Sequence, residues 1–150
     1  MSRYEELRHL FQEPPEARAA LTRREMLAAL ERARADLAEL AGAGLEHLQA
    51  AFGARSEELV EIAAESATNL QQLLDTLPPD GSSATDAAGI RALRHDLRGP
   101  VGTLRGAAMM LARRNARPDD RLAERAAGVT RAAEELRDIV DALLEDERRL

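Results

Sequence analysis

The sequence contains no cysteine, no tryptophan and no lysine, and aromatic residues make up only 2% of its 150 positions. Without cysteine, disulfides and thiolate metal sites are excluded. A core with so few aromatics must consist of Leu, Ala, Val, Ile and Met, which suits close helix packing better than a β-sandwich or barrel. No apolar run is long enough to cross a bilayer, and the charged N-terminus lacks the apolar segment of a signal peptide. We therefore expect an all-α, cytoplasmic protein with no membrane contact.

Acidic residues outnumber basic ones, and the excess lies in the first part of the chain. Residues 1–85 hold 8 Arg against 15 Asp and Glu, about −7, whereas residues 86–150 hold 13 Arg against 12 acids, about +1. Non-specific nucleic-acid binding needs a basic surface that displaces counterions. Neither part supplies such a surface, so we expect no nucleic-acid partner.

Breaks in the helical pattern divide the chain into an N-terminal helical region (1–77), a linker (78–85) and a C-terminal region (86–150). The linker holds the helix breaker PPDGSS. In the N-terminal region, apolar residues step by four and three positions, with an interruption at Gly42 and Gly44 and a new helix start at Ser56. We interpret this region as helical or coiled-coil, with a role in signal input or partner binding.

The C-terminal region predicts two helices joined by a short loop at NARPDD, residues 115–120. Both helices carry an apolar stripe at helical spacing. The first stripe is Ile90, Leu93, Leu97, Val101, Leu104, Ala108 and Leu111, and the second is Leu122, Ala126, Val129, Ala133, Leu136, Val140 and Leu143. Such regular stripes across a short loop predict an antiparallel hairpin.

An isolated helical hairpin buries too little apolar surface to be stable. It must therefore pack on the N-terminal helices or on a second copy of itself. We favour the second copy, which gives a homodimeric four-helix bundle.

One histidine stands apart from the first stripe. At 100° per residue, His95 lies about 160° around the helix from Leu97, so it is predicted to face solvent. Gly99, Gly102 and Gly106 follow four, seven and eleven positions later, on nearly the same side. Each glycine inside a helix costs about 0.5–1 kcal/mol relative to alanine. Either another backbone must approach this face closely, or small residues have simply accumulated in a chain rich in Ala and Gly.

The segment HDLRGPV, from His95 to Val101, resembles the H-box of bacterial sensor histidine kinases. The hairpin around it, residues 86–150, resembles their dimerisation and histidine-phosphotransfer domain. The resemblance implies that His95 accepts a phosphoryl group on a neutral ring nitrogen. Asp96 would orient the ring and take up its proton, and Arg98 would help to neutralise the phosphate. Pro100 would give the helix the bend of the family.

The same resemblance implies a partner, the receiver domain of a response regulator. It would dock on Gly99, Gly102 and Gly106, with Arg91 and Met109 also in contact. The chain itself would bind no cofactor, because the Mg²⁺ of the transfer reaction arrives with the receiver. Gly99 stands where family members that dephosphorylate their partner carry Thr or Asn, so phosphatase activity is not expected.

Nothing else in the sequence points to a site. His9 and His47 have no second ligand at metal-like spacing, so no metal site is expected. The 150 residues include no P-loop and nothing like the Asn-rich helix and Gly-rich lid of the kinases' ATP-binding domain.

The sequence thus favours a phosphorelay module that exchanges a phosphoryl group between His95 and a receiver aspartate, with a separate histidine kinase as a further candidate partner. A non-catalytic scaffold or inhibitor that binds a kinase or response regulator, with His95 unphosphorylated, stays open. So does a fragment of a larger sensor kinase.

Overall fold

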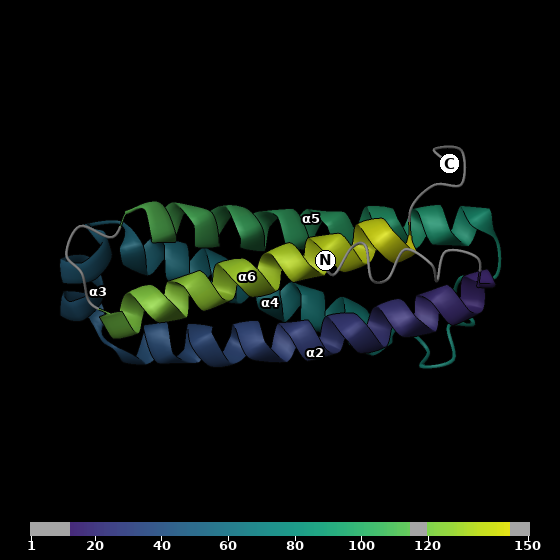
Figure 1. The fold of residues 1–150 in the computed structure, drawn as a ribbon, viewed down its shortest axis with the longest axis horizontal. Coiled ribbons are helices and arrows are strands. Elements are labelled where there is room, and N and C mark those ends of the chain that lie inside the picture. The colour runs from purple at the N-terminus through teal and green to yellow at the C-terminus, as the bar shows by residue number, and fades with distance from the viewer. Residues whose placement is uncertain (1–12, 115–119, 145–150) are drawn as a thin grey trace.

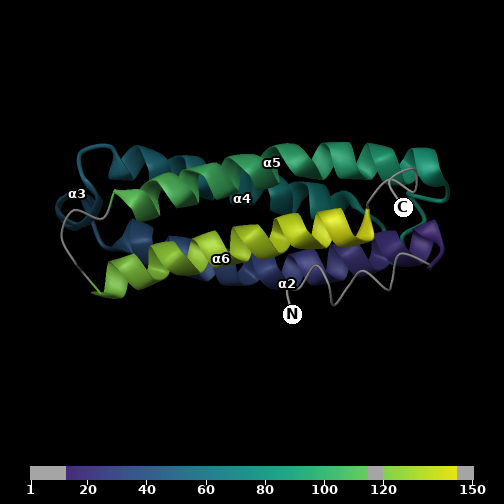
Figure 2. The ribbon, with the colours of Figure 1, turned by 45° about the horizontal axis from the view of Figure 1, so that its top comes forward.

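Four long helices run alternately up and down along a common axis (Figure 1, Figure 2). The computed structural model describes residues 13–114 and 120–144. Within these ranges the elements are all helices: α2 (Pro15–Gly42), α3 (Leu45–Phe52), α4 (Ser56–Thr76), α5 (Ala87–Arg113) and α6 (Asp120–Leu143). The short α3 lies at the end where the chain turns from α2 into α4. The all-α class and the C-terminal helical hairpin, α5–α6, are confirmed, while the loop residues 115–119 lie outside the described ranges.

The apolar stripes of the hairpin form one half of the core. All seven stripe residues of α5 and all seven of α6 are at most 7% exposed. The corresponding residues of α2, Met26, Leu30, Ala33, Leu37 and Leu40, are at most 4% exposed. Among the described helices, none combines the length and the apolar character that a membrane span requires.

The hairpin's apolar face is covered by α2 and α4 of the same chain. Each long helix has two neighbours: α2 packs on α4 and α6, and α5 packs on the same two helices. The four-helix bundle is thus complete within one chain, whereas the sequence favours pairing with a second copy. The regular stripe shows that this face of the hairpin must be buried. An apolar stripe of the same spacing on α2 can cover it as well as a second hairpin can.

The contact between α2 and α6 is reinforced by charged side chains. Arg125 of α6 pairs with Asp36 at 3.1 Å and with Glu39 at 2.8 Å, both on α2. The pKa of Arg125 is raised, mainly by the hydrogen bond to Asp36 and to a smaller extent by the negative charge of Glu39. Gly128 allows this close approach, because a Cβ there would collide with the Asp36 carboxylate. Asp36 thus holds α6 against the N-terminal region.

The first turns of α2 cap the ends of two other helices. The Nε of Arg18, a residue only 2% exposed, donates to the carbonyl oxygen of Leu143 at the end of α6, at 2.8 Å. The Nε of Arg23 donates to the carbonyl oxygen of Leu74 at the end of α4, at 3.1 Å. The last carbonyls of a helix have no partner within the helix and carry partial negative charge, so a guanidinium stabilises them.

The connection between α4 and α5 is fixed to the same end of α2. Gly81 is buried with φ +75°, and a Cβ there would collide with the carbonyl oxygen of Glu16. Only glycine combines this left-handed conformation with so close an approach. Asp86 then caps α5, because its carboxylate accepts a hydrogen bond from the Gly89 N–H at 2.8 Å. The N-terminal region and the hairpin therefore form a single bundle with one core.

Because the bundle is complete within one chain, we expect the protein to be a monomer. Light scattering coupled to size exclusion should give the chain mass of 16.4 kDa across a wide concentration range. A mass of twice that value at every concentration would contradict this packing and would support two paired hairpins instead.

Candidate functional site

His95 lies on the outward face of α5. Its side chain is exposed, whereas Leu97, two residues further on, is fully buried in the core. Asp96 is exposed as well. The orientation predicted for His95 from the helical period is therefore confirmed. The imidazole is accessible to a large partner.

The glycines that follow His95 form an open strip along α5. Gly99, Gly102 and Gly106 are all exposed. A Cβ built on any of them would meet no atom within 4 Å, apart from the helix's own backbone. The strip is therefore free surface and contributes nothing to packing between helices. His95 stands at the N-terminal end of a surface that another molecule can approach to backbone distance.

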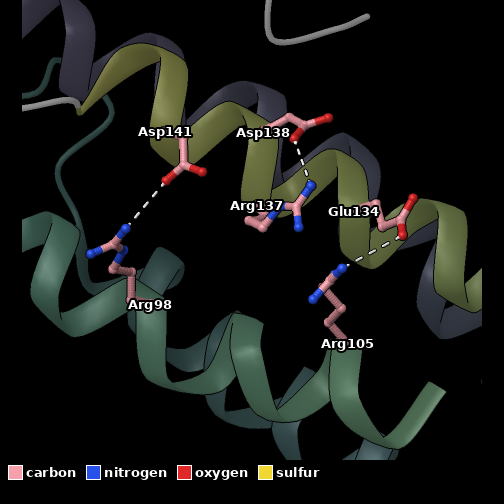
Figure 3. A network of polar contacts seen from close by, with 6 residues as sticks. All are labelled: Arg98, Arg105, Glu134, Arg137, Asp138 and Asp141. Atoms are coloured by element: carbon pink, nitrogen blue, oxygen red, sulfur yellow. Dashed lines mark hydrogen bonds and ion pairs between the residues drawn. The ribbon is translucent and has the colours of Figure 1, made fainter. Parts of the chain in front are cut away.

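On the side of α5 that faces α6, the flank of this strip is rich in arginine. At 100° per residue, Arg91, Arg94, Arg98 and Arg105 all lie on this flank. The guanidinium of Arg98 pairs with Asp141 of α6 at 3.7 Å, and the guanidinium of Arg105 pairs with Glu134 at 3.9 Å (Figure 3). Arg91 is exposed, and Met109, on the same flank, is partly buried. Of these residues, Arg98 is three positions after His95 and so lies within one helical turn of it.

The opposite flank faces α4 and differs in charge. Pro100 and Thr103 line a groove of about 660 Å³ together with residues of α4, among them Glu65, Asn69 and Gln72. The sequence of α4, residues 56–76, contains five Asp and Glu and no Arg. Glu65 is the one charged residue among those that line this groove, so the His95 strip has several arginines on the side of α6 and an acid without arginine on the side of α4. Sequence reasoning missed this asymmetry because it depends on which helices neighbour α5.

Pro100 sits inside α5, which continues through it to Arg113. Because proline has no backbone N–H, the carbonyl of Asp96 loses its usual helical donor. One turn further on, the hydroxyl of Thr103 donates to the carbonyl oxygen of Gly99 at 3.1 Å. The backbone near His95 is therefore less fully bonded within the helix than the rest of α5.

His95 is thus an exposed histidine on the first helix of a helical hairpin, with Asp96 next to it in the sequence and Arg98 one turn further along the helix. Residues 90–149, which include His95, match the family model of the His Kinase A (phospho-acceptor) domain. The match agrees with the H-box resemblance, and it supports a phospho-acceptor histidine in two-component signalling. No curated protein and no solved structure matches the chain.

If the strip is free surface, its glycines weaken the protein and alanine should strengthen it. We expect Gly102→Ala to raise the free energy of unfolding by about 0.5–1 kcal/mol, because alanine is the better helix former. Gly128→Ala is the matched control, a glycine within α6 whose added Cβ would collide with Asp36. It should give no gain or a loss. Chemical denaturation measures both, and a loss of stability in Gly102→Ala would place the strip in a packed interface.

Proposed function

We propose that the chain is a phosphotransfer module in which His95 exchanges a phosphoryl group with the aspartate of a response-regulator receiver domain. The observation that carries the proposal is the exposed imidazole, on the hairpin that matches the phospho-acceptor family, at the end of an open glycine strip. A receiver must bring its aspartate within bonding distance of the ring. A bare helix face allows that approach.

The reaction balances without a further reactant. A neutral ring nitrogen of His95 attacks the phosphorus of the aspartyl phosphate, so that an N–P bond forms and the acyl O–P bond breaks. The receiver's carboxylate leaves, and the imidazole loses its remaining ring proton. The reverse reaction returns the phosphoryl group to the carboxylate. The Mg²⁺ that this exchange uses is held by the receiver, and the chain needs no metal of its own.

Two neighbours of His95 have roles in this proposal. The Asp96 carboxylate, exposed on the residue that follows His95, would favour one tautomer and accept the released proton. The guanidinium of Arg98, one turn away, pairs with phosphate oxygens as negative charge accumulates. Arg98 is 55% exposed and its contact with Asp141 is long, so this guanidinium can turn toward His95 at little cost.

Domains of this family typically dimerise and interact with response regulators. In this chain, α2 and α4 cover the apolar face of the hairpin, so each bundle presents one His95. We infer that one chain carries one phosphoryl group and engages one receiver at a time.

The proposal is tested by incubating the protein with a ³²P-labelled phosphorylated receiver. We expect label that is acid-labile and alkali-stable on the wild type, and none on His95→Gln. His47→Gln is the matched control, because His47 is an exposed histidine on α3, near the other end of the bundle. This variant should retain the label.

Label that persists in His95→Gln would contradict the site assignment. If the wild type binds receivers but takes up no label from any of them, the protein acts as a scaffold or inhibitor instead.

A further inference from the structure

The two ion pairs between α5 and α6 leave a gap between them. The two arginines, Arg98 and Arg105, are two turns apart on α5, and their partners, Asp141 and Glu134, are two turns apart on α6. The middle of this interval is Gly102 on α5. Glycine brings no side chain to the contact, and a Cβ there would meet nothing within 4 Å.

Arg137 of α6 lies beside this gap. It stands midway between Glu134 and Asp141 in the sequence, and Figure 3 shows its guanidinium between the two ion pairs. Its ion pair within the described chain is with Asp138, the next residue on its own helix, at 3.5 Å. Adjacent residues on a helix do not face each other, so this contact holds the guanidinium weakly. Arg137 is 45% exposed and therefore accessible.

These residues border a groove of about 270 Å³. Its lining is Arg98, Val101, Gly102, Arg105, Arg137, Val140 and Asp141. Val101 and Val140 are at most 3% exposed and form an apolar floor, while the three arginines stand around it. An apolar floor below guanidinium groups suits a side chain with a short aliphatic stem and a terminal carboxylate.

We propose that this groove receives an acidic side chain of the receiver domain, with Arg137 as its main partner and Arg105 beside it. The inference rests on the proposed function, since it names how the same partner is recognised. Gly102 belongs both to the groove and to the open strip, so a receiver placed over His95 also covers the groove.

Charge selects this groove over the one on the other side of α5. The groove toward α4 has Glu65 and no arginine in its lining, so it offers an acidic partner no positive charge. On the side of α6, the pairs made by Arg98 and Arg105 are 3.7 and 3.9 Å long and partly exposed. Such pairs contribute little, so Arg105 can share a new carboxylate at small cost.

The test compares Arg137→Gln with Arg131→Gln. Both remove one positive charge from α6, but Arg131 is exposed and is not among the residues that line the groove. The 150-residue chain is phosphorylated on His95 with phosphoramidate, and purified receiver domains are tried one at a time to find the one that is loaded fastest. For that receiver, kcat and KM of transfer are then measured.

We expect Arg137→Gln to raise KM about tenfold, the loss typical of a charge-assisted hydrogen bond, with kcat within about twofold. Arg131→Gln should leave both parameters within about twofold. The difference between the two variants should shrink as the ionic strength rises. Gly102→Leu, which fills the gap without removing charge, should also raise KM.

Equal effects of the two arginine variants would mean that only overall charge matters, and would overturn the proposal. A fall in kcat at unchanged KM would overturn it too, because Arg137 would then act on the transfer step. A wild type that is phosphorylated on His95 but transfers to no receiver also overturns it, and this leaves His95 as an acceptor. Absence of phosphorylation from both phosphoramidate and phosphorylated receivers would instead overturn the proposed function itself.

Discussion

The burial of the hairpin's apolar face by α2 and α4 is the interaction on which the rest of the structure depends. It fixes the rotation of α5 about its own axis, since Leu97 and Leu104 point into the core with no exposed surface. His95 must then face outward. The same packing places α4 on one side of α5 and α6 on the other, so the His95 face has an arginine-lined groove on one side and a groove without arginine on the other.

The composition of α5 reflects two demands on one helix. Burying one leucine stabilises a protein by about 1.5–3 kcal/mol, whereas one glycine in a helix costs about 0.5–1 kcal/mol relative to alanine. A helix with a fully buried stripe can therefore carry three glycines on its outer face and remain folded. The outer face is then free to fit a partner. The arginine caps at the start of α2 and the buried Gly81 turn keep the His95 end of the bundle closed.

Much of this was readable from the sequence, because helical period and burial are linked directly. The stripes of α5 and α6 and the exposure of His95 follow from spacing alone. The burial of single residues could not be predicted where it depends on local backbone geometry. Spacing does not reveal that Leu45 is 46% exposed directly after Gly44, which has φ +88°, or that Leu74 is fully buried where Leu73 is partly exposed.

What covers the hairpin could not be read from its stripe, because a stripe specifies that a face is buried and not by which helix. The gap at Gly102 and its neighbour Arg137 were equally hidden. They become visible only when α5 and α6 are set side by side in register, with Arg98 opposite Asp141. Roles that depend on two helices at once therefore need the structure.

The central claim is that one imidazole, His95, carries the phosphoryl group. It is tested most directly by tandem mass spectrometry of the protein at neutral to alkaline pH after exposure to a phosphorylated receiver, because the chain has three histidines and the spectra assign the modification to one of them. The account predicts phosphate on His95 alone. Phosphate on His9 or His47, with His95 unmodified, would contradict it.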